Sequence, residues 1–184
     1  MREAAVETLS VQSASFAVPV IAARLLDDRW PMVRAAAADA LAHHGPSPVA
    51  DRALGEALDD ASRSVKIPVL RAIGIRHAVQ YAERIRGMFA EDPLVEVRAA
   101  SAATLGLLCD TESTEALTRY ALAVGDPMAP AADRAIGGAA LVALGQLRPA
   151  DLRQRLAPLL VKGAPVDART AAERVLAGTG GCRR

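Results

Sequence analysis

Basic side chains recur at a fixed spacing and are the first candidates for chemistry. They stand 32 residues apart before one longer step, and they are Arg2, Arg34, Lys66, Arg98 and Arg169. A stripe of this kind could bind phosphate groups. Three of these bases, however, follow an acid by six residues, and the acids are Asp28, Asp60 and Asp92. We therefore favour a structural ladder, in which acids of the turns meet these bases, over a phosphate-binding stripe.

Histidine and cysteine are the other candidate ligands. His77 and Cys109 occupy the same place in neighbouring repeats, and His44 lies one place from it. Imidazole and thiolate bind zinc, but helices of neighbouring repeats lie ~8–10 Å apart, and no CxxC or HxxxH spacing occurs. We expect no metal site. Two cysteines make no disulfide framework in a chain of this size, and Cys182 falls in a Gly-rich stretch, 178–184, that we expect to be a flexible tail.

Nothing in the sequence predicts catalysis. It contains no GxSxG motif and no Gly-rich phosphate loop. Only 3% of residues are aromatic and the net charge is +1, which disfavours a nucleic-acid enzyme or any nucleic-acid partner. The start of the chain is acidic, unlike a signal peptide, and no apolar run reaches the ~20 residues of a membrane span. We predict a cytoplasmic protein without catalytic residues, cofactor or membrane insertion.

The elements that would position these side chains are repeated helices. Alanine accounts for 41 of the 184 residues, and alanine is the best helix former. Self-comparison finds six copies of a ten-residue segment at a spacing of 32, with one seven-residue insertion. The copies cover 1–10, 33–42, 65–74, 97–106, 136–145 and 168–177. Positions one, five, eight and nine of a copy are apolar or small, which predicts a helix with one buried face.

Further helices are expected between the copies, over 49–58, 79–89, 114–122 and 152–160. Acidic turns, often with proline, join the two helices of a repeat, and we expect such acids to cap and charge-match the N-terminus of the following helix. The insertion is close to two helical turns, so we expect a lengthened helix that begins near Pro130 or Ala131. The chain then starts with a lone second helix, followed by five helix pairs up to residue 177.

This pattern resembles the HEAT repeat family, in particular the short bacterial repeats also found in phycobilisome lyase subunits. The matching residues are Asp92-Pro93, Val97-Arg98, Ala100 and Leu105-Gly106. The resemblance covers nearly the whole chain and implies an all-α, right-handed solenoid over 1–177. Gly137 stands where the repeat has Arg, and Gly163 where it has Asp. The ladder of acids and bases should therefore break at the fifth copy.

In a curved array of this kind, positions three, six and seven of each copy should face the concave side. In the middle copies they are mostly apolar or small, and they are Ile67, Leu70, Arg71, Ala99, Ala102, Ala103, Gly138, Leu141 and Val142. An exposed apolar strip indicates a binding surface, with Leu70 and Leu141 as anchors and Arg71 and Val142 as flanking contacts. The alternative is that these Ala-rich helices simply pack deeper.

These features predict a non-catalytic interaction module that binds an apolar or helical segment of another protein in its concave groove. The alternative is a partner-dependent subunit of a lyase-type complex, as the resemblance to bilin lyase subunits implies. Val6, Leu9 and Val11 also leave the N-terminal end apolar. That end could dock on another chain or on a second copy.

Overall fold

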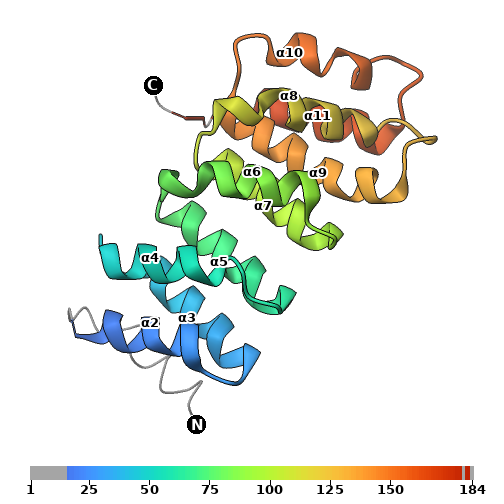
Figure 1. The fold of residues 1–184 in the computed structure, drawn as a ribbon. Helices are drawn as coiled ribbons and strands as arrows, with labels where there is room; N and C mark the ends of the chain where they lie inside the picture. Colours follow the sequence, from blue (N-terminus) through green and yellow to red (C-terminus); the bar gives the residue numbers. More distant parts are fainter. Residues whose placement is uncertain (1–15, 180, 183–184) are drawn as a thin grey trace. The chain divides into compact units, whose positions relative to one another are not determined.

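The computed structural model describes residues 16–179, 181 and 182, and every regular element among them is a helix (Figure 1). The all-α prediction is confirmed for this part of the chain. The chain divides into two compact units, one that ends at Tyr81 and one that begins at Ala82. The first repeat copy and the apolar N-terminal end lie outside the described residues. In the part that the structure describes, no helix combines the length and apolar character needed to cross a membrane.

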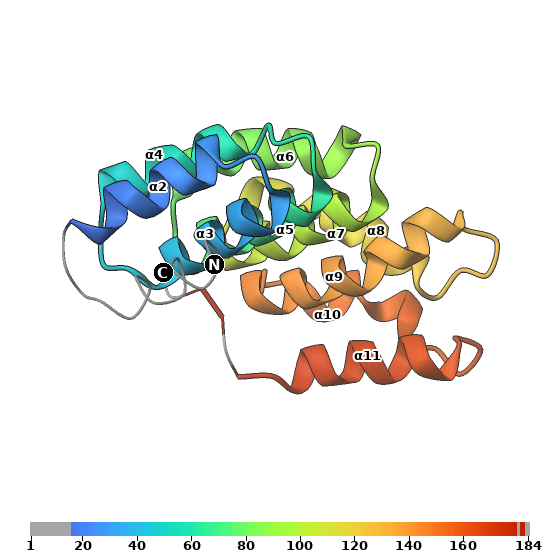
Figure 2. The same ribbon diagram turned by 90° about the horizontal axis from the view of Figure 1, so that it is seen from below.

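The first unit is built from two helix pairs. Its helices are α2 (Ala17–Asp27), α3 (Pro31–His43), α4 (Pro48–Ala57) and α5 (Arg63–Ile75), followed by the short η1 (Val79–Tyr81). Figure 2 shows α2 beside α4 in one layer and α3 beside α5 in the other. The apolar stripes of the four helices meet between these layers, where Ile21, Leu25, Leu41, Leu54 and Ile73 are fully buried.

A buried arginine joins the two pairs of this unit. The Arg76 guanidinium forms an ion pair with Asp51 at 2.6 Å. It also donates to the carbonyl oxygens of Leu41 and His44 at 3.0 and 2.7 Å. Only 4% of the Arg76 side chain is exposed. It therefore satisfies carbonyls at the end of α3 that have no partner within their own helix.

The second unit surrounds one long helix, α9. Its elements are α6 (Ala82–Glu91), α7 (Val95–Leu107), η2 (Thr111–Ser113), α8 (Thr114–Ala123), α9 (Ala131–Leu147), α10 (Leu152–Arg155), η3 (Ala157–Leu159) and α11 (Val166–Ala177). Helix α9 packs against α7, α8 and α11. Its buried residues Ile136, Ala140, Ala143 and Leu144 follow the spacing expected of the core face of a helix.

Most of the predicted spacing is confirmed. Helices α3, α5 and α7 each contain 13 residues and begin at Pro31, Arg63 and Val95, which are 32 residues apart. Helix α9 begins at Ala131, as the insertion predicted, and contains 17 residues. The predicted helix over 152–160 is wrong, because the segment forms only α10 and η3. Pro158, which has no N–H and whose ring crowds the preceding turn, disfavours a continuous helix and lies in η3.

Three helix ends share an unusual conformation. His77, Cys109 and Arg148 follow α5, α7 and α9 with φ angles of 51°, 58° and 45°. After α5 and α7 the next N–H bonds back to a carbonyl five residues earlier, from Ala78 to Ile73 and from Asp110 to Leu105. This is the Schellman helix end, in which glycine is the usual left-handed residue. The side chains at these ends therefore occupy a strained backbone position.

Candidate functional site

The turn acids have one local role in common. In each turn an aspartate Oδ1 accepts a hydrogen bond from the N–H two residues later, and the pairs are Asp28–Trp30, Asp60–Ser62, Asp92–Leu94 and Asp126–Met128. These acids close Asx turns. Side chains of the residues that precede α3, α5, α7 and α9 make no capping bond to those helices. The predicted capping role is therefore corrected, because the carboxylate bonds to the turn rather than to the helix.

The predicted ladder has one complete rung in the first unit. Arg34 donates to both carboxylate oxygens of Asp60, at 2.6 and 3.0 Å, and to the carbonyl of Asp28 at 2.8 Å. Burial raises the pKa of Asp60, but hydrogen bonds from Arg34 and from the Ser62 N–H outweigh it, and the pKa is lowered overall. The hydrogen bond to Asp60 raises the pKa of Arg34. Arg34 thus bonds to the side chain of the next repeat's acid and to the main chain of the acid of its own repeat.

For Lys66 in the first unit and Asp92 in the second, membership of the ladder stays a prediction. Lys66 lies half-buried on α5, and Asp92 closes its own turn. Arg98 donates to the carbonyl of Phe89 at 2.9 Å and to the hydroxyl of Tyr120, whose ring it also covers. Arg169 is half-buried on α11 and has no ion pair within the described part of the chain. Arg98 therefore contacts the aromatic side chain of Tyr120 where the ladder predicted an acid.

Glycine replaces arginine at the fifth copy because α8 comes too close for a side chain. A Cβ added to Gly137 would lie 2.6 Å from the carbonyl oxygen of Tyr120 and 2.5 Å from Cγ2 of Val124. Gly106 allows a similar approach, since its Cβ would lie 2.7 Å from Cα of Ala143. The predicted break of the ladder is therefore a site of close helix packing.

Position six of the copies does not lie on a surface. Leu70 and Ala102 have no exposed area, and Leu141 is 2% exposed. The prediction that Leu70 and Leu141 anchor a partner is therefore wrong. Both side chains are core residues of their own units, which is the deeper packing left open as the alternative.

Positions three and seven lie at the surface instead, one helical turn apart. Gly138 and Val142 are exposed on α9, whereas Ala99 and Ala103 are half-buried on the neighbouring α7. In the first unit Ile67 is half-buried. Arg71 is exposed and pairs with Asp39 at 2.5 Å. These two residues stand 32 apart and are the position-seven residues of two adjacent copies. The same position is thus charged in the first unit and apolar or small in the second.

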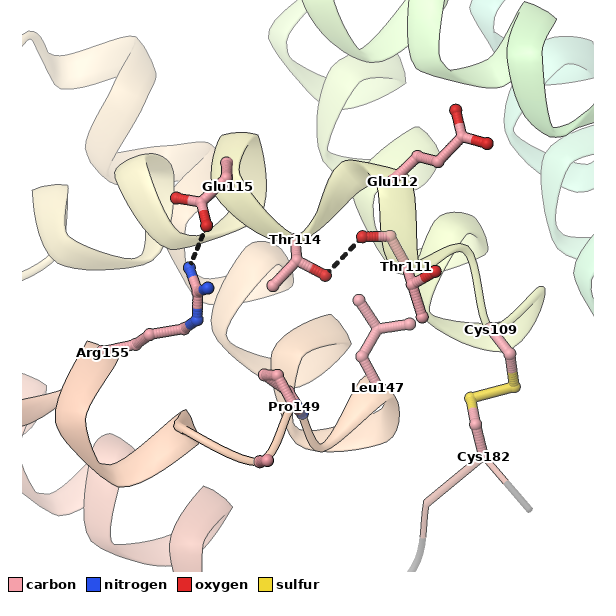
Figure 3. A pocket seen from close by; sticks show the side chains of 10 residues that line it. Cys109, Thr111, Glu112, Thr114, Glu115, Leu147, Pro149, Arg155 and Cys182 are labelled. Atoms are coloured by element: carbon pink, nitrogen blue, oxygen red, sulfur yellow. Dashed lines mark hydrogen bonds and ion pairs between the residues drawn. A yellow bond between two sulfur atoms is a disulfide. The ribbon is translucent and has the colours of Figure 1, made fainter. Parts of the chain in front are cut away.

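A hollow of about 460 Å³ opens at another edge of the second unit (Figure 3). Its rim carries Glu112 and Glu115, and its wall includes Leu147, Pro149 and Arg155. Arg155 pairs with Glu115 at 2.7 Å. Its hydrogen bonds to Asp151 and, second, to Glu115 raise the pKa of Arg155. The hollow was not predicted, because it is formed by η2 and the α9–α10 connection, which lie outside the ten-residue copies.

The cysteines also differ from expectation. Cys109 and Cys182 form a disulfide, with Cα atoms 5.6 Å apart, and both residues line the hollow (Figure 3). The sequence predicted no disulfide framework and a flexible tail around Cys182, and it did not predict this single bond. The two cysteines are 73 residues apart in sequence, and only the fold of the second unit brings them together. The even cysteine count was the one signal in the sequence.

The structure brings together no metal-binding group among its described residues, which contain no cluster of three or more histidine, cysteine or acidic side chains suited to an ion. His77 occupies the strained end of α5.

No family model matches the chain, and no curated protein is significantly similar to it in sequence.

Proposed function

We propose that this chain is a HEAT-like repeat protein, a right-handed solenoid, that binds an apolar helix of another protein and performs no chemistry itself. The period of 32 residues, repeated in the starts of α3, α5 and α7, supports the repeat assignment. The binding surface would be the exposed face of α7 and α9 in the second unit. We call the residues Ala99, Ala103, Gly138 and Val142 the small-residue face.

Gly138 carries this proposal. It lies in the interior of the 17-residue α9, and an added Cβ would have no atom within 4 Å. Glycine inside a helix costs about 1 kcal/mol relative to alanine, and here no contact of the unit requires it. One turn later Val142 is 54% exposed. A smooth, apolar helix face allows the backbone of a second helix to approach closely.

Gly87 shows why glycine alone is insufficient. It lies in α6, is exposed, and also has open space at its Cβ. Its neighbours one turn away on the same helix are Glu83 and Glu91, both exposed. Gly87 thus has an acid on both sides, whereas Gly138 has the exposed Arg134 one turn before it and the exposed Val142 one turn after it. The combination of glycine with the exposed apolar Val142 therefore distinguishes the α9 face.

The comparison between repeats points the same way. In the first unit the exposed position-seven residues form the ion pair Arg71–Asp39. At the equivalent positions of the second unit stand Ala103 and Val142. A face that water alone contacted could carry charges there, as the first unit does. The apolar choice in the second unit fits a surface that another protein covers.

The test uses Gly138→Arg with Gly87→Arg as the matched control. Both changes place the same long cation on an exposed helix position of the same unit, and circular dichroism with thermal unfolding checks that both variants are folded. We expect partners recovered from native lysate by the intact chain to be retained by Gly87→Arg and lost by Gly138→Arg. Equal recovery by both variants would rule out the small-residue face as the binding surface.

A further inference from the structure

The segment that follows α11 crosses the ends of two other helices in the second unit. The N–H of Cys182 donates to the carbonyl of Gln146, near the end of α9, at 2.9 Å. The Arg148 guanidinium donates to the carbonyl of Gly178. The disulfide then joins Cys182 to Cys109, which stands two residues after the end of α7. We call residues 178, 179, 181 and 182 the strap.

Noncovalent contacts hold the strap weakly. Gly178, Thr179 and Gly181 are exposed, and Cys182 is half-buried. None of these residues is a large apolar side chain that could anchor the strap by burial. Gly181 packs on the stem of Arg148, where a Cβ would lie 2.7 Å from Cδ. The disulfide is therefore the main attachment of the strap.

The bond is also accessible to reagents. Cys109 is exposed, in the left-handed position after α7. Both cysteines line the hollow beside Thr111, Leu147 and Pro149 (Figure 3). A thiolate attacks a disulfide at a sulfur atom, so exchange requires open access to one of the two sulfurs. A fully buried structural bond would not offer that access.

We propose that the Cys109–Cys182 disulfide is a redox-controlled latch for the strap. A cellular dithiol attacks one sulfur, forms a mixed disulfide and leaves as its own disulfide. Two electrons and two protons pass to the chain, which then carries two thiols. Reduction detaches the strap from the ends of α7 and α9 and removes Cys182 from the wall of the hollow. Exchange with an oxidised cellular disulfide, which takes up the two electrons and two protons and leaves as a dithiol, restores the latch.

This role reconciles the bond with the location that the sequence predicts. Disulfides are rare in reducing compartments, and those found there are usually transient, catalytic or redox-sensing. A cytoplasmic protein with this bond therefore needs a function for making and breaking it. The latch is independent of the small-residue face and goes beyond the proposed interaction function.

Hydrogen–deuterium exchange with mass spectrometry tests the latch on the full chain. We compare air-oxidised protein with protein reduced by dithiothreitol and alkylated with iodoacetamide. On reduction we expect at least a tenfold faster exchange of the amide of Cys182, with unchanged exchange inside α9. The double variant Cys109→Ser/Cys182→Ser should match the reduced protein. Two free thiols in the denatured, air-oxidised protein would overturn the proposal at once.

Two further outcomes distinguish a latch from a structural disulfide. Faster exchange throughout α7 and α9 on reduction, or failure of the double variant to fold, would make the bond a structural staple and overturn the latch. Arg148→Met is the matched control, because it removes the side-chain bond to Gly178 and keeps the disulfide. We expect its oxidised form to keep the strap protected. Release of the strap in that oxidised variant would show that the disulfide is not the attachment.

Discussion

Two adjacent glycines of α9 give opposite predictions for the same substitution. Gly137 faces α8, where an added Cβ would lie 2.6 Å from the carbonyl oxygen of Tyr120. Gly138 faces open space, with no atom within 4 Å of an added Cβ. Both lie well inside the helix Ala131–Leu147. Alanine at either position brings the same gain in helix propensity, so the difference between the variants measures the contact alone.

The magnitudes follow from these distances. Alanine in place of an interior glycine is favoured by about 1 kcal/mol, so Gly138→Ala should raise the free energy of unfolding by that amount. At Gly137 the same gain is opposed by overpacking, typically ~1–3 kcal/mol. The obstructing atom belongs to the backbone of α8 and cannot rotate away, so the upper end applies and the net loss is about 2 kcal/mol. The two variants should differ by roughly 3 kcal/mol.

Thermal unfolding followed by circular dichroism provides the assay. A change of 1 kcal/mol moves the Tm of a chain this size by ~2–4 °C, so the two variants should be separated by about 6–12 °C. Urea unfolding with equal m-values would confirm that stability has changed without a change in the surface exposed on unfolding. If Gly137→Ala is stabilised as much as Gly138→Ala, the close approach of α8 and α9 is refuted. Destabilisation by Gly138→Ala would refute the open face.

Three other predictions concern stability and use urea unfolding. Arg76→Met leaves buried carbonyls and a carboxylate without their cation, and it should lower the free energy of unfolding by about 2–4 kcal/mol. The exposed Arg71→Met should lower it by at most ~1 kcal/mol, and equal losses would contradict the burial argument. Because the pKa of Asp60 is lowered, its carboxylate stabilises the fold above the ordinary Asp pKa of 3.8, and this stability is lost as pH falls through the pKa in the folded state. Arg34→Met should flatten this dependence of stability on pH, and an unchanged dependence would count against the Arg34–Asp60 pair. His77→Gly should add about 0.5–1 kcal/mol by relieving the left-handed strain, whereas a loss would show that the imidazole has a stabilising contact.

The sequence predicted the features that depend on local spacing. The 32-residue period placed α3, α5 and α7, because helix length and the buried stripe are set by residues close together in the chain. The start of α9 at Ala131 followed from the length of the insertion and from Pro130 before it. The turn acids were found for the same reason, although their partner is the N–H two residues later rather than the helix.

Features that depend on distances between helices were not predictable from one sequence. Leu141 and Val142 are adjacent and both apolar, yet one is 2% and the other 54% exposed. Which of them faces the core depends on the rotation of α9 against its neighbours. The disulfide depends likewise on the path of the chain after α11, over a separation of 73 residues. The repeat pattern contains no information on the rotation of α9 or on the path of the chain after α11.

The burial of position six determines how the interaction proposal must be tested. A charge in place of Leu70 or Leu141 would enter the core of its own unit, where an unpaired charge is strongly destabilising. Loss of binding by such a variant would report unfolding rather than a lost contact. Gly138→Arg avoids this ambiguity, because its side chain extends into open space from a helix that keeps its packing. A partner that requires close backbone approach is excluded by that side chain alone, so loss of binding by a stably folded Gly138→Arg would assign the surface.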